Sequence, residues 1–187
     1  VAVGNYDLGI CGRDWVEELS VKYRSRSIIK LRPLGYGARD LYLVAGESSP
    51  VSSLKQLQAY DGQVRIASEY PNLAEMVALR LRLKRFRVFP VWGAAESYPP
   101  DSAELALCAS DNGAVAKGLV PLARIQSPGA YLIANKDSWL GKDLTPVLSR
   151  LDDKGMADYA EEMPISIVKR TDRVGRTPPT PSGKANV

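Results

Sequence analysis

Histidine is absent from the 187 residues of this chain, and cysteine occurs only twice. The lack of histidine removes the commonest general base and the commonest zinc ligand. Any catalysis must therefore use carboxylates, tyrosines, lysines, backbone amides or a hard metal ion bound through oxygen. The two cysteines, Cys11 and Cys108, are too few for a disulfide framework and lack the spacing of a metal site. We interpret both as small buried residues.

Long hydrophobic runs and a strong charge imbalance are missing as well. No apolar run approaches the ~20 residues of a membrane span, and the N-terminus does not have the form of a signal peptide, so we expect a cytoplasmic protein without a membrane partner. The net charge of +4 suits anionic ligands but is too small to predict nucleic-acid binding. Much of the positive charge lies between Arg80 and Arg87. It either complements a helix dipole or attracts a polyphosphate ligand.

The residues that are present suit an α/β domain or two small lobes, because 45% of them are hydrophobic. Predicted strands and apolar segments are Val1 to Ile10, Ile28 to Leu34, Asp40 to Ala45, Val64 to Ala67, Val88 to Trp92, Ala103 to Ala109, Leu119 to Ile125 and Tyr131 to Asn135. Predicted helices are Trp15 to Leu19, Leu54 to Tyr60 after a Ser52 or Ser53 cap, Leu73 to Lys84, Leu144 to Leu151 and Met156 to Glu162. Strands that alternate with helices at this spacing predict mainly parallel pairing. We expect disorder beyond about Gly175.

One junction between a strand and a helix is especially informative. The segment Arg65 to Leu73 joins an apolar strand to a helix that Asn72 can cap, with Glu75 at the third helical position. A helix N-terminus at the carboxyl end of a strand offers N–H groups to an anion, which predicts a phosphorylated ligand. The segment Gly9 to Asp14 predicts a second such turn. The two turns can face each other across a crevice.

Four segments occur in the order and with much of the spacing of one enzyme family. Asp7 to Asp14, Arg65 to Leu73, Gly93 to Glu96 and Leu132 to Asn135 resemble the ATP phosphoribosyltransferase family. The resemblance implies two α/β lobes similar to type II periplasmic binding proteins, with a cleft between them. Residues 1–40 and 124–187 would form the first lobe and residues 41–123 the second. Members join ATP to phosphoribosyl pyrophosphate (PRPP) with Mg²⁺, giving N1-(5-phosphoribosyl)-ATP and pyrophosphate in the first step of histidine biosynthesis.

The resemblance also implies roles for individual residues, although it assigns no metal ligand directly. Glu96 would lie beside the ribose or the metal; the alternative is a surface carboxylate at a strand end. Implied nucleotide-binding residues are Gly12, Arg13, Asp14, Arg65, Ser68 and Tyr70. Turn geometry and helix capping are alternative explanations for the first three, and Tyr70 is equally explained as a packing aromatic. This chemistry needs positioning and charge neutralisation rather than a nucleophilic side chain, so it suits a protein without histidine.

The loop after Cys108 departs from the family pattern. Family members carry an Asp and then a Thr-Gly-x-Thr loop that wraps the 5-phosphate of PRPP. Here Cys108 takes the place of that Asp, the threonines are missing and the loop is about two residues shorter. Ser110, Asn112 and the amide of Gly113 are the remaining donors. Asp111 would place a negative charge near the phosphate, which is unfavourable unless a cation intervenes.

The parts of the family pattern that this sequence contains bear on its expected partners and on the alternative functions. The family's first strand and its Lys-Gly-Arg-type loop, expected before Val1, and the regulatory domain of the long form are not in this sequence. The resemblance thus implies a short-form catalytic subunit that forms a homo-oligomer and works with a regulatory subunit resembling a histidyl-tRNA synthetase. The first alternative is a non-catalytic nucleotide-binding or regulatory paralogue, which would bind adenine nucleotide but not PRPP. A solute receptor of the same fold is disfavoured by the missing export signal.

Overall fold

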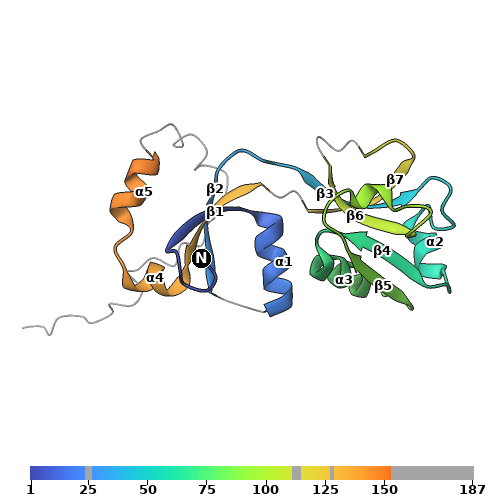
Figure 1. The fold of residues 1–187 in the computed structure, drawn as a ribbon, viewed down its shortest axis with the longest axis horizontal. Helices are drawn as coiled ribbons and strands as arrows, with labels where there is room; N and C mark the ends of the chain where they lie inside the picture. The colour runs from blue at the N-terminus through green and yellow to red at the C-terminus, as the bar shows by residue number, and fades with distance from the viewer. Residues whose placement is uncertain (24–26, 111–114, 127–128, 153–187) are drawn as a thin grey trace, which may run out of the picture.

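The computed structural model describes residues 1–23, 27–110, 115–126 and 129–152 (Figure 1). Its elements in chain order are β1 (Leu8–Gly12), α1 (Arg13–Tyr23), β2 (Ile28–Pro33), β3 (Asp40–Gly46), α2 (Leu54–Ala59), β4 (Val64–Ser68), α3 (Pro71–Arg80), β5 (Phe86–Pro90), the 3₁₀ turn η1 (Ala95–Ser97), β6 (Leu105–Ser110), β7 (Leu119–Gln126), β8 (Ala130–Asn135), α4 (Lys136–Gly141) and α5 (Thr145–Asp152). The α/β class predicted from the sequence is confirmed. Within these ranges, none of the helices combines the length and apolarity needed to cross a bilayer.

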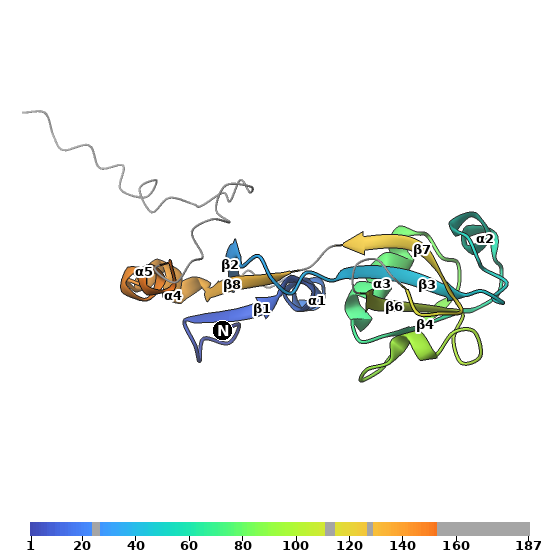
Figure 2. The ribbon, with the colours of Figure 1, turned by 90° about the horizontal axis from the view of Figure 1, so that it is seen from above.

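The strands form two separate sheets. One has three strands in the order β1-β8-β2, and the other has five in the order β5-β4-β6-β3-β7. We call the three-stranded sheet with α1 the first lobe, and the five-stranded sheet with α2, α3 and η1 the second lobe. The chain passes between them after β2 and again after β7, and α1 of the first lobe packs against α3 of the second (Figures 1 and 2). The two lobes therefore meet along these helices.

The prediction of mainly parallel pairing was wrong. Among the described strands, only the pairs that β4 makes with β5 and β6 are parallel. β3 is antiparallel to β6 and β7, and β8 is antiparallel to β1 and β2. The reason is the route of the chain between lobes. β3 leads into the five-stranded sheet and its neighbour β7 leads out, so these two strands run in opposite directions (Figure 2). Helical crossovers connect parallel strands only around β4.

The start of the chain also differs from prediction. The strand begins at Leu8 rather than Val1, and the expected turn from Gly9 is instead the strand β1. Pairing with β8, from Leu8 opposite Ala134 to Gly12 opposite Ala130, holds these glycines extended. The Ser53 cap of α2 is confirmed, since its hydroxyl accepts from the Gln56 amide at 3.3 Å. The predicted helix from Met156 to Glu162 and the tail beyond Gly175 lie outside the described residues.

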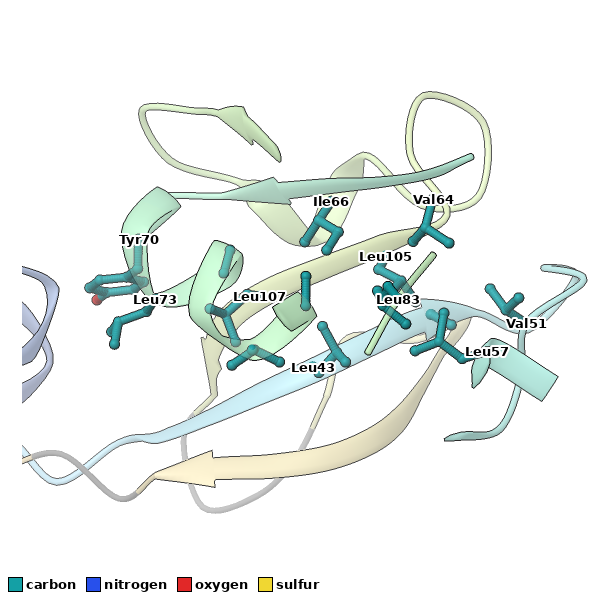
Figure 3. Packing of buried hydrophobic residues seen from close by; sticks show 14 of the residues in the cluster. Leu43, Val51, Leu57, Val64, Ile66, Tyr70, Leu73, Leu83, Leu105 and Leu107 are labelled. Atoms are coloured by element: carbon teal, nitrogen blue, oxygen red, sulfur yellow. The ribbon is translucent and has the colours of Figure 1, made fainter. Parts of the chain in front are cut away.

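The five-stranded sheet buries side chains on both faces. The larger cluster lies toward α2 and α3, and Figure 3 shows Leu43, Ile66, Leu73 and Leu107 among its members. Successive side chains of a strand point to opposite faces, so Cys108 follows Leu107 onto the other face, where it packs in one cluster with the buried Ala95 of η1. This alternation places η1 over the end of β6 and α3 on the opposite side.

Candidate functional site

Three strand ends of the second lobe converge at one edge. β4 and β6 are parallel, so their carboxyl ends at Ser68 and Ser110 lie at the same edge of the sheet. β3 is antiparallel to β6 and begins at that edge, with Asp40 opposite Ser110. The first residues of α1 reach this edge from the first lobe, because Asp14 contacts Tyr70 there. The two junctions singled out in the sequence thus face each other.

Tyr70 joins the lobes at this edge. Its hydroxyl donates to Asp14 Oδ2 at 2.7 Å, and its ring centroid lies 4.9 Å from that of Trp15. Burial raises the pKa of Tyr70 well above its usual value, and the bond to Asp14 acts in the same direction. The phenol therefore remains a hydrogen-bond donor at neutral pH. Tyr70 is also part of the larger core cluster, so its packing role and its place at the candidate site coexist.

The neighbouring residues of β1 and α1 have local roles. The second oxygen of Asp14, Oδ1, accepts from the Trp15 amide at 2.9 Å. A side chain at Gly12 would collide with this carboxylate, so a larger residue there would require Asp14 to move. Arg13 lies 3.6 Å from Glu17 on its own helix. Gly12 and Asp14 thus have local roles without a ligand, whereas the buried Nε of Arg13 has no hydrogen-bond partner among the described residues. The predicted nucleotide contacts of all three residues remain predictions.

Ser68 and Arg65 occupy different surroundings on the same strand. The Ser68 hydroxyl is fully buried, donates to the Leu107 carbonyl at 3.0 Å and accepts from the Tyr70 amide at 2.9 Å, so it fixes the turn into α3. Arg65 instead forms an ion pair with Glu104, with Nη2 and Oε1 2.7 Å apart. Burial alone would raise the pKa of Glu104, but the bonds from Arg65 outweigh it and lower that pKa. The structure places Ser68, but not Arg65, next to Tyr70.

The predicted anion site at the start of α3 is filled by the protein itself. The helix begins at Pro71 after an N-cap at Tyr70, so the predicted Asn72 cap was wrong, and Glu75 lies too far along for a capping box. The backbone amides of Asn72 and Leu73 donate to the two carboxylate oxygens of Glu18 at 2.9 and 2.7 Å. Sequence reasoning missed Glu18. Its only signal was its spacing of four residues from Asp14, which places both on one face of α1.

Glu96 and Cys108 lie together on the other face of the sheet. η1 carries Glu96 and is anchored by the fully buried Ala95, while Ala94 before it has a left-handed backbone with φ of 52°. Burial raises the pKa of the Cys108 thiol to about 11, and the charges of Glu96 and Glu69 act in the same direction, opposed by Arg39. Cys108 is therefore a neutral thiol at pH 7.

Electrostatic interactions define one group of residues at the edge. Glu69 and Arg39 influence both Tyr70 and Cys108. We call the group the interlobe cluster, and its members are Asp14, Arg39, Glu69, Tyr70, Glu96 and Cys108. Sequence reasoning missed Arg39 and Glu69; Arg39 directly precedes the predicted strand from Asp40, and Glu69 lies within the informative segment from Arg65 to Leu73. The buried Ser110 ends β6 at this edge, whereas Asn112 and Gly113 lie outside the described residues.

The interlobe cluster does not contain a preformed metal cage. In the ranges that the structure covers, no three His, Cys, Asp or Glu residues are grouped to bind a metal ion. The charges of Glu69 and Glu96 nevertheless both raise the pKa of Cys108, so two carboxylates belong to its electrostatic surroundings. Mg²⁺ is usually bound by one or two carboxylates together with substrate phosphates. The residues present therefore fit a magnesium ion that arrives with a polyphosphate.

The Cys108 thiol predicts a loss of stability at alkaline pH. The pKa of this thiol is about 11 in the folded state, against an ordinary value of 9.0. Below pH 9 the thiol is neutral in both states and does not reduce stability. Between pH 9 and 11 it ionises more readily in the unfolded chain, so the free energy of unfolding falls as pH rises. We expect the free energy of unfolding of the wild type to fall by roughly 2 kcal/mol relative to Cys108→Ser over that window. Urea unfolding under reducing conditions measures this difference. If the free energies of unfolding of the two proteins changed equally with pH, the burial of this thiol would be contradicted.

The comparisons with known proteins agree with one another. Residues 1–153 match the family model described as HisG: ATP phosphoribosyltransferase. ATP phosphoribosyltransferase from Chlorobium phaeobacteroides is 29% identical over 146 residues, which cover 74% of this chain and 46% of the relative. The enzyme of that name from Thermodesulfovibrio yellowstonii is 26% identical over 141 residues, with 74% and 47% covered. The chain therefore spans about half the length of the curated relatives it matches.

Two solved structures share the fold. The ATP phosphoribosyl transferase (HisG:HisZ) complex from Thermotoga maritima matches with a TM-score of 0.65 and 22% identity, covering 80% of this chain and 69% of that one. The protein XAC2383 from Xanthomonas citri matches with a TM-score of 0.55 and 14% identity, covering 80% of this chain and 63% of that one. At these identities the structures establish a common α/β fold.

Proposed function

The chain belongs to the ATP phosphoribosyltransferase family, and from this premise we propose that it transfers the phosphoribosyl group of PRPP to ATP. The products would be N1-(5-phosphoribosyl)-ATP and pyrophosphate, in the first step of histidine biosynthesis and in the cytoplasm. The family match over residues 1–153 carries this proposal. The interlobe cluster supports it, because residues from both lobes meet where the family resemblance implies the substrates.

The proposed reaction suits the side chains at this edge. A bond forms between adenine N1 and the anomeric carbon, and the bond from that carbon to a pyrophosphate oxygen breaks. Adenine N1 is the nucleophile, so the protein needs only to position the substrates and stabilise charge. Glu96 would stabilise positive charge that develops on the ribose. Tyr70, held by Asp14 at 2.7 Å and by its ring contact with Trp15, would form a fixed wall on the nucleotide side.

Magnesium would be bound mainly by the substrate. Glu96 and Glu69 are the carboxylates that would hold it, together with the phosphates of PRPP. When bound, the ion neutralises charge on the departing pyrophosphate. Arg39 contributes a positive charge in the same neighbourhood, as its effect on Cys108 indicates. We infer that it faces the phosphate groups of a bound substrate.

A second subunit belongs to the proposal. The Thermotoga maritima structure is a complex of HisG with HisZ, and the resemblance of this chain to short-form catalytic subunits implies a regulatory subunit similar to a histidyl-tRNA synthetase. We propose that this chain forms a homo-oligomer and binds such a subunit.

A coupled absorbance assay tests the proposed function. The chain, its regulatory partner, ATP, PRPP and Mg²⁺ are combined, and formation of phosphoribosyl-ATP is followed while pyrophosphate is removed. We expect turnover that requires both PRPP and the chain. A complete assembly without turnover would exclude the reaction.

One observation favours a second candidate function. Cys108 is a neutral, buried thiol, and the family resemblance implies an Asp at this position. If that correspondence is right, the thiol favours a nucleotide-binding or regulatory paralogue without catalysis. Calorimetry separates the candidates. Tight binding of ATP without any binding of PRPP and Mg²⁺ would support the paralogue, whereas binding of both supports the enzyme.

A further inference from the structure

Glu18 makes a set of contacts that crosses between the lobes. It belongs to α1 of the first lobe, yet its Oε1 accepts from the backbone and side-chain amides of Asn72, and its Oε2 accepts from the Leu73 amide at 2.7 Å. Only 6% of Glu18 is exposed. Both carboxylate oxygens therefore bind the first turn of α3 in the other lobe.

The first turn of a helix has amides without acceptors inside that helix. A neighbouring side chain usually supplies the acceptor, but the N-cap of α3, Tyr70, makes no side-chain capping bond. Glu18 takes that role from the opposite lobe. Its negative charge also lies at the positive end of the α3 dipole, where an anion is stabilised.

We propose that Glu18 is a latch between the lobes, so that opening of the lobes and uncapping of α3 are one event. Separation of the lobes would take the Glu18 carboxylate away from the amides of Asn72 and Leu73, which would then lose their acceptor. The Tyr70 bond to Asp14 and its ring contact with Trp15 lie on the same pair of helices and separate in the same step. The latch is independent of the proposed reaction, because every contact that carries it is within the protein.

Amide hydrogen exchange in the full chain measures the latch directly. We expect Glu18→Gln to accelerate exchange of the Asn72 and Leu73 amides by at least about tenfold, because hydrogen bonds to a charged acceptor are worth that much or more. The Ile66 amide in the centre of β4 should keep its protection, which shows that the fold is intact. Small-angle scattering of the same samples should show a larger radius of gyration as the open form becomes populated.

Glu17→Gln is the matched control. Glu17 is adjacent on α1 but pairs with Lys30 of its own lobe at 2.5 Å, so exchange at Leu73 and the radius of gyration should not change. Unchanged exchange at Leu73 in Glu18→Gln would overturn the latch.

Tyr70→Phe tests the same event from the second lobe if Glu18→Gln does not fold. This variant removes the bond to Asp14 and leaves the Glu18 contacts in place. Because we propose that all the contacts open together, exchange at Leu73 should accelerate severalfold. Exchange at the wild-type rate would show that the contacts open separately and would contradict the proposal.

Discussion

Glu96→Gln is expected to lower turnover in the proposed phosphoribosyl transfer by about a hundredfold or more, the usual effect of removing one group that stabilises transition-state charge. Glutamine has nearly the same shape but no charge, so it cannot stabilise positive charge on the ribose. The fold should tolerate the change, because the buried Ala95 rather than Glu96 anchors η1. We therefore expect the thermal unfolding midpoint to move by no more than roughly 2 °C. The coupled assay and a thermal melt of one preparation measure both quantities.

Glu47→Gln provides the matched control for this variant. Glu47 directly follows β3, which begins at the edge of the interlobe cluster, so Glu47 lies at the opposite edge of the same sheet. It is exposed, and we expect both turnover and stability to equal those of the wild type. A variant Glu96→Gln that loses stability but keeps its turnover would show that Glu96 is a structural carboxylate. The proposed catalytic role would then be wrong.

The sequence predicted those parts of the fold that depend on neighbouring residues. The apolar runs at β3 and β4 and the Ser53 cap are local patterns, and each was found close to its predicted position. Strand direction is different, because it depends on where the chain enters and leaves a sheet. The opposite directions of β3 and β7 follow from the two passages between lobes, and no local pattern records them.

In the candidate site, too, some features were predictable from the sequence and others were not. The facing junctions were predictable, since Asp14 and Tyr70 each lie at the start of a helix that follows a strand. The partners of individual side chains were not predictable. Glu18 binds amides 54 and 55 residues further along the chain, and Arg65 binds Glu104, 39 residues away. A local pattern can show that a side chain is polar, but only the packed lobes determine which other polar group it meets.

The substitution Cys108→Asp should strengthen PRPP binding by about tenfold or more in the presence of Mg²⁺, if this position corresponds to the family's Asp. One charge-assisted hydrogen bond to a bound ligand has that magnitude. Without ligand the variant should be less stable, because burial and the nearby charges of Glu96 and Glu69 disfavour a third carboxylate. Calorimetry with PRPP and Mg²⁺ measures the affinity, and urea unfolding measures the stability.

Cys108→Asn separates charge from shape in this experiment, since asparagine has the size of aspartate without its charge. The carboxyl of the Asp variant should have a folded pKa raised above its unfolded value, so its penalty is absent at low pH and grows as pH rises through about 4. The Asn variant should show no such trend and no gain in PRPP affinity. Magnesium with PRPP should offset the penalty in the Asp variant, because a cation among Glu69, Glu96 and the new carboxylate relieves their repulsion. A dissociation constant equal to that of the wild type would mean that Cys108 does not occupy the position of the family's Asp.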